Sequence, residues 1–93
     1  MSFVISDKIR AKLLEKHGVS VEEVFECFSN RDGGFLEDTR EDHLTDPPTQ
    51  WFIAETNYGR RLKVCFIFKN GDVLIKTAYS PNTIEESIYS KHS

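Results

Sequence analysis

The chain has 93 residues, the length of one small domain, and hydrophobic residues make up 39% of it, enough for one modest core. No apolar run approaches the roughly 18 residues of a membrane-spanning helix. Residues 1–10 also lack the basic start, long apolar middle and cleavage site of a signal peptide. We therefore expect a single cytoplasmic domain without a membrane partner. The formal net charge of −3 excludes a strongly basic chain, although a local basic surface remains open.

Two short helices are predicted at the start of the chain. Ser6 or Asp7 can cap the first helix, and Ser20 and Glu23 form the S-x-x-E capping box of the second. Gly18 lies between them, where a helix ends in a left-handed residue. The apolar residues at helical spacing are Ile9, Leu13 and Leu14 in the first helix and Val21, Val24, Phe25 and Phe28 in the second.

Strands are predicted in the second half of the chain, at residues 50–56, 61–68 and 73–79, which are rich in aromatic and branched side chains. Asn70-Gly71 joins the last two as a two-residue hairpin, because both positions tolerate positive φ. The three segments therefore predict an antiparallel meander, to which residues 35–38 can add a fourth strand.

A polar loop and a short helix complete the predicted elements. Residues 39–50 are polar and contain two prolines, which favours an exposed loop. Thr83 and Glu86 form a second capping box, which starts the C-terminal helix. We expect an α+β fold: two N-terminal helices packed on a three- or four-stranded antiparallel sheet, with a short C-terminal helix.

Charge is unevenly distributed along the chain. Residues 37–46 contain five acids and one base, whereas residues 60–79 contain five bases and one acid. Lys63 and Lys76 lie on strands joined by the tight hairpin, so we expect them close together on the face that the helices leave open. That surface is either a solvated sheet face or a site for a phosphate chain. The acidic segment is either a solvated loop or a docking surface for a basic partner.

The K-H-G-V-S-x-E-E block from Lys16 to Glu23 resembles the signature of BrnT-like toxins, a branch of the RelE-like ribonuclease toxins of type II toxin–antitoxin modules. The similarity continues in an E-D-x-R segment at residues 37–40 and in the strand–turn–strand pattern of residues 51–79. It covers roughly residues 7–89. The resemblance implies a single RelE/BrnT-like domain over residues 1–93 that cleaves RNA. It also implies a cognate antitoxin, a small DNA-binding protein that masks the toxin, so that no direct DNA binding is expected without it.

Position by position, Lys16 and His17 match the K-H of the block, and Arg60 or Arg61 matches the family's G-R. Ala78 matches the alanine of a final S-A-R segment, but Tyr79 stands where the family has arginine. The C-terminal helix also departs from the Arg-rich pattern, since it carries Glu85 and Glu86.

Metal-independent RNA cleavage needs a base, an acid and cations for the phosphorane charge, and RNA offers bases for aromatic stacking. The candidates for proton transfer are His17, Tyr79 and Glu22 or Glu23. The candidate catalytic cations are Arg60, Arg61 and Lys76, and the candidate RNA-binding residues are Lys16, Lys63, Trp51 and Tyr58. The histidines and cysteines show no metal-ligand spacing, so neither metal nor cofactor is expected.

Each candidate also has a structural interpretation. His17 in a last helical turn interacts favourably with the helix dipole, and Glu22 and Glu23 do so at a helix start. Trp51 fits the core, and Arg60 and Arg61 fit a solvated turn. Cys27 and Cys65 are expected as buried free thiols.

Two functions of different class follow. The first is an RNA-cleaving toxin held in check by its antitoxin. The second is a catalytically degenerate RelE-like protein that binds a small partner without cleaving RNA, which the missing arginine and the net charge favour. A small-molecule enzyme finds little support, because the sequence has no phosphate loop and no nucleophile motif.

Overall fold

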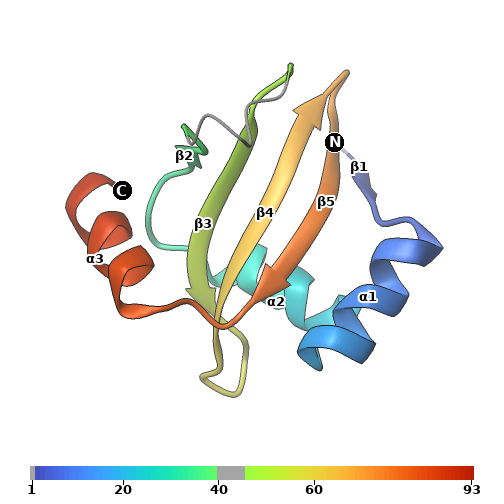
Figure 1. Cartoon of the computed structure of the whole chain (residues 1–93), viewed down its shortest axis with the longest axis horizontal. Coiled ribbons are helices and arrows are strands. Elements are labelled where there is room, and N and C mark those ends of the chain that lie inside the picture. The colour runs from blue at the N-terminus through green and yellow to red at the C-terminus, as the bar shows by residue number, and fades with distance from the viewer. Residues whose placement is uncertain (1, 40–45) are drawn as a thin grey trace.

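The computed structural model describes residues 2–39 and 46–93 (Figure 1). In chain order its elements are β1 (Ser2–Val4), α1 (Asp7–His17), α2 (Val21–Asn30), β2 (Leu36–Glu37), β3 (Thr49–Glu55), β4 (Arg61–Lys69), β5 (Asp72–Tyr79) and α3 (Thr83–His92). The strands form one sheet in the order β1-β5-β4-β3-β2. β1 runs parallel to β5, and the other neighbours are antiparallel.

The α+β class is therefore confirmed, and the predicted fourth strand is present as β2. The prediction of a three- or four-stranded antiparallel sheet is wrong, because the described part of the chain forms a five-stranded mixed sheet. The extra strand is β1, which pairs with residues 72–74 of β5 from the other end of the chain. A three-residue strand is too short to show a period-2 pattern, so no sequence signal predicts it.

Local capping chemistry defines α1 and α2 as expected. The Ser6 hydroxyl accepts from the Ile9 amide at 3.1 Å, and Gly18 follows α1 with a φ of 60°. At α2, the Ser20 hydroxyl accepts from the Glu23 amide at 3.2 Å, and the Glu23 carboxylate accepts from the Ser20 amide at 3.0 Å. In the described ranges no helix has the length and apolar character needed to cross a bilayer.

The start of α3 lies one residue earlier than predicted. Asn82 and Glu85, rather than Thr83 and Glu86, form its capping box, with the Asn82 side chain accepting from the Glu85 amide at 2.8 Å. Both pairs have capping spacing, but asparagine is among the strongest N-cap residues.

The β4–β5 hairpin turns at Asn70 and Gly71 as predicted, with φ values of 53° and 83°. A β-bulge then interrupts the expected alternation in β5. Cys65 pairs with Thr77 while the next residue, Phe66, pairs with Ile75, so Lys76 is the extra residue. As a result Ala78 is buried opposite Val64, rather than lying on the face that strict alternation predicts.

Helices cover both faces of the sheet around β3. The Phe52 ring contacts the Phe28 ring of α2, with centroids 4.7 Å apart, whereas the adjacent Trp51 ring lies 5.8 Å from Tyr89 of α3. Successive strand residues point to opposite faces, so α2 and α3 lie on opposite sides of the sheet. In the view of Figure 1, α3 lies beside β3, whereas α1 lies beside β5.

Both cysteines are buried thiols, as expected. Burial raises the pKa of Cys27 to about 11, so this thiol stays protonated at neutral pH. Its sulfur lies 3.7 Å from the carbonyl oxygen of Ala54, which places it between α2 and β3. Cys27 therefore belongs to the core.

Candidate functional site

One end of the sheet brings together side chains that are far apart in the sequence. Lys63 near the start of β4 pairs in register with Tyr79 at the end of β5. The His17 ring, at the end of α1, lies 5.6 Å from the Tyr79 ring. Glu85 of α3 completes the group, because its carboxylate contacts both Lys63 and Tyr79. We call His17, Lys63, Tyr79 and Glu85 the sheet-end cluster.

Lys63 is a buried cation with 5% of its surface exposed. Its Nζ donates to Glu85 Oε2 at 2.7 Å and lies 4.5 Å from the centre of the Trp51 ring. Burial by itself would lower the pKa of this ammonium, but the hydrogen bond to Glu85 and neighbouring groups raise the pKa above its ordinary value. Lys63 is thus held charged between an aromatic ring and a carboxylate.

The Tyr79 hydroxyl and the Glu85 carboxylate form the donor and acceptor of the cluster. The hydroxyl donates to Glu85 Oε2 at 3.1 Å, and the Asn82 amide donates to Glu85 Oε1 at 3.0 Å. Burial raises the pKa of Tyr79. Burial also acts to raise the pKa of Glu85, but the hydrogen bonds from Lys63 and Asn82 outweigh it and lower that pKa. At neutral pH Tyr79 is therefore a proton donor and Glu85 an anion.

His17 is the last residue of α1, and its role in proton transfer stays a prediction. Its backbone carbonyl belongs to the turn that Gly18 closes, which confirms the structural interpretation. Burial lowers the pKa of its imidazole, and the nearby charges of Lys12 and Lys16 lower it further. The ring is therefore neutral at pH 7, the state in which an imidazole can accept a proton.

Arg61 lies on the same face of β4 as Lys63 and also pairs with α3. Its guanidinium donates two hydrogen bonds of 2.7 Å to the Glu86 carboxylate. The hydrogen bond from Arg61 lowers the pKa of Glu86. This pair is open to solvent, with 46% of the Arg61 side chain and 35% of the Glu86 side chain exposed. Arg61 is therefore more accessible than Lys63.

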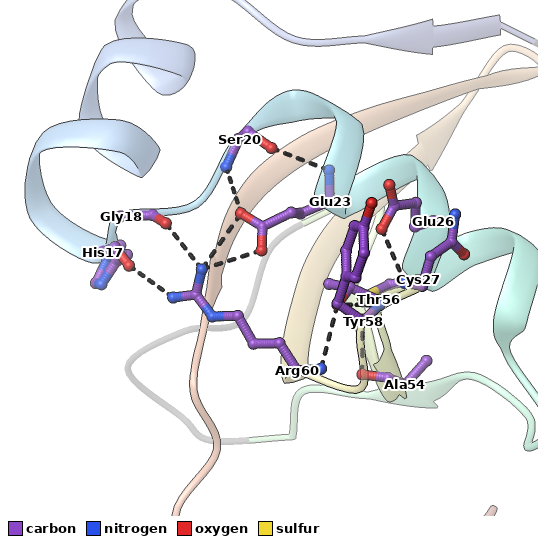
Figure 2. A network of polar contacts seen from close by, with 11 residues as sticks. His17, Gly18, Ser20, Glu23, Glu26, Cys27, Ala54, Thr56, Tyr58 and Arg60 are labelled. Carbon is purple, nitrogen blue, oxygen red and sulfur yellow. Dashed lines mark hydrogen bonds and ion pairs between the residues drawn. The ribbon is translucent and has the colours of Figure 1, made fainter.

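Arg60 points to the opposite face and has a structural environment (Figure 2). Its guanidinium donates to the carbonyl oxygens of His17 at 3.0 Å and Gly18 at 2.8 Å. It also pairs with the Glu23 carboxylate at 3.1 Å. Figure 2 shows it reaching from the β3–β4 turn to the turn between α1 and α2. Arg60 thus ties two turns together and contacts the sheet-end cluster at the backbone carbonyl of His17.

We expect Arg60→Ala to lower the free energy of unfolding by about 1 to 2 kcal/mol, because three acceptors lose a charged donor. The guanidinium is 36% exposed, which keeps the effect below that of a fully buried group. Chemical denaturation followed by circular dichroism measures it. Arg10→Ala, an exposed arginine of α1, is the matched control and should change stability by less than about 0.5 kcal/mol. Equal effects of the two substitutions would contradict the structural role of Arg60.

The remaining candidates lie apart from the cluster or are covered. Lys16 and Lys76 are exposed, and Tyr58 is 96% exposed at the β3–β4 turn. Trp51 is buried at 7% exposure, with Lys63 over its ring and Tyr89 beside it. Residues 40–45, which hold much of the acidic segment, lie outside the described residues.

The expected open basic face is a prediction that the structure contradicts. Lys63 pairs with Tyr79, so Lys76 is displaced by three residues, about 10 Å along the strand. Lys76 is exposed at the bulge, whereas Lys63 lies beneath α3. Glu85 is not among the site residues predicted from the sequence. The Asn82–Glu85 capping spacing was the signal that could have indicated it.

A groove of about 750 Å³ lies beside the cluster, and Trp51, Lys63 and Glu85 contribute to its lining. Ile84 and Ile88 of α3 form an apolar part of the same groove. Among the described residues, no three histidine, cysteine or acidic side chains are grouped as a metal site. No protein-family model matches the sequence, and no curated protein matches it either.

Proposed function

We propose that this protein is the toxin of a type II toxin–antitoxin module and cleaves RNA without a metal ion at the sheet-end cluster. The observation that carries the proposal is the meeting of His17, Lys63 and Tyr79 at one end of the sheet. These residues supply a neutral imidazole, a buried cation and a protonated phenol. Together they provide the base, the charge stabilisation and the acid that the reaction requires.

In the proposed mechanism, neutral His17 takes the proton from a ribose 2′-hydroxyl. The 2′-oxygen attacks the adjacent phosphorus, and the bond from phosphorus to the 5′-oxygen breaks. Lys63 stabilises the negative charge of the phosphorane, and Tyr79 protonates the leaving 5′-oxygen. Arg61, on the same face of β4, holds a neighbouring phosphate. The products are a 2′,3′-cyclic phosphate and a 5′-hydroxyl end.

A second candidate is the catalytically degenerate RelE-like protein that binds a partner without cleaving RNA. One specific observation favours it: Arg60, Arg61 and Lys63 are each paired with a glutamate. In this arrangement the cations stabilise the fold and α3 rather than a bound phosphate. The antitoxin remains the proposed partner under both functions.

The test uses purified protein and a labelled RNA oligonucleotide in the presence of EDTA. We expect cleavage that leaves 2′,3′-cyclic phosphate ends, and induction of the gene alone in a bacterial host should slow growth. His17→Ala and Tyr79→Phe should each lower the cleavage rate about 100-fold or more. Arg10→Ala, on the exposed surface of α1, is the control and should cleave normally. If neither the native chain nor any variant cleaves the RNA, the non-catalytic binding protein becomes the better supported proposal.

A further inference from the structure

Two consecutive glutamates of α3 pair with Lys63 and Arg61 of β4. Glu85 accepts from Lys63 at 2.7 Å, and Glu86 accepts two hydrogen bonds of 2.7 Å from Arg61. Both glutamates lie in the first turn of α3, and the capping box with Asn82 holds the Glu85 carboxylate. The negative charges that neutralise the proposed RNA site therefore come from one short helix.

The Glu85 carboxylate lies where a phosphate oxygen is needed. Its Oε2 accepts from Lys63 Nζ and from the Tyr79 hydroxyl at the same time. These are the groups to which the proposed mechanism assigns the phosphorane charge and the leaving-group proton. A phosphate and this carboxylate thus compete for the same two donors.

Access to Lys63 requires α3 to move. The Lys63 side chain is 6% exposed and the Glu85 side chain 15% exposed, which leaves no room for an RNA phosphate beside the ammonium. The nearby groove reaches Lys63 from one side, but it is lined there by Glu85 as well. The structure is therefore a closed state of the proposed site.

α3 is attached to the sheet largely through polar contacts, which favours its opening away from the sheet. Tyr89 is the residue that α3 buries, and its hydroxyl donates to the Gly34 carbonyl at 2.8 Å. Ile84 and Ile88 of the same helix are 68% and 42% exposed. By contrast, α2 buries Val24 and Cys27. Elements that bury little apolar surface open at lower free energy than the core.

We propose that α3 is an autoinhibitory cover, in which Glu85 and Glu86 occupy Lys63 and Arg61 until an RNA phosphodiester displaces them. This inference rests on the proposed function, since it assigns the covered cations to RNA. It explains why a site with catalytic groups is neutralised in the free protein. It also identifies Glu85 and Glu86 as competitors of the substrate rather than catalytic residues.

The test is the Glu85→Gln/Glu86→Gln double variant. Glutamine also serves in a capping box, so α3 itself should remain helical while its two charges are lost. We expect RNA cleavage to become about tenfold faster, as the loss of two partly exposed ion pairs predicts. The Glu15→Gln/Asp72→Asn variant, with exposed Glu15 on α1 and Asp72 at the opposite end of β5, removes the same charge and should show no comparable gain.

A 2′-O-methyl RNA oligonucleotide has no 2′-hydroxyl nucleophile, so its binding tests the displacement of α3 independently of RNA cleavage. The glutamine variant should bind this probe about tenfold more tightly than the native chain, and amide hydrogen exchange in α3 should be faster. Absence of cleavage with tighter binding would reject the proposed function and support the cover. Unchanged binding, or a native chain that cleaves RNA as fast as the glutamine variant does, would overturn the cover.

Discussion

Replacing Phe52 by alanine is expected to lower the free energy of unfolding by about 3 to 5 kcal/mol. Phe52 is completely buried in β3 beneath α2. Its ring contacts those of Phe28, Phe35 and Phe66, with centroids 4.7, 5.6 and 6.2 Å apart. Alanine leaves a cavity among these three rings and removes the edge-to-face contacts that each makes with Phe52. Domains of this size have only about 5 to 15 kcal/mol of stability, so a large fraction of it is lost.

Urea denaturation of Phe52→Ala, followed by tryptophan fluorescence and circular dichroism, measures this effect. Tyr58→Ala is the control, because it also deletes an aromatic ring but at a position that is 96% exposed. We expect that control to change stability by less than about 0.5 kcal/mol. A loss below about 1.5 kcal/mol for Phe52→Ala would contradict the aromatic packing between α2 and the sheet.

Local chemistry explains which parts of the fold the sequence predicts. The Ser20–Glu23 capping box, the left-handed Gly18 and the Asn70-Gly71 turn all involve residues close in the chain. The strands β3, β4 and β5 begin and end within one residue of the predicted bounds, because their apolar runs are bounded by turn residues. These features needed no knowledge of tertiary contacts.

Long-range contacts explain what the sequence did not predict. β1 joins the sheet through parallel pairing with residues 72–74, a partner about seventy residues away that no local pattern specifies. The bulge at Lys76 follows from packing between β4 and β5, and one inserted residue is enough to reverse the face of Ala78. The predicted basic face assumed strict alternation and therefore failed.

The candidate site, like the fold, is predicted only in part by the sequence. Basic and aromatic residues of β4 and β5 are visible in the sequence, and the resemblance pointed to His17. Their partners are not visible, because the pairing of Glu85 and Glu86 with β4 depends on how α3 packs on the sheet, where Tyr89 contacts Trp51. A helix with few apolar residues gives no sign of which face it will cover. The neutralisation of Lys63 and Arg61 is therefore a tertiary property.

Replacing Lys63 by methionine is expected to lower the free energy of unfolding by about 2 to 3 kcal/mol. The Lys63 side chain is 6% exposed, so its removal leaves the Glu85 carboxylate partly buried without its cation. Breaking a fully buried pair from one side costs about 3 to 5 kcal/mol, and the 15% exposure of Glu85 reduces this value. Lys76→Met, at an exposed position of the neighbouring strand, is the matched control and should be nearly neutral.

A double-mutant cycle with Glu85→Gln shows whether the loss belongs to the pair. Lys63→Met/Glu85→Gln should be more stable than additivity predicts, by about 1 to 2 kcal/mol, because no unpaired carboxylate remains. The coupling must also depend on pH. The pKa of Glu85 is lowered from 4.5 in the folded chain, so its contribution is complete above about pH 4.5 and is lost as the pH falls through the folded value. Additive effects at neutral pH, or a coupling that survives protonation of Glu85, would show that the ion pair does not hold α3 on the sheet.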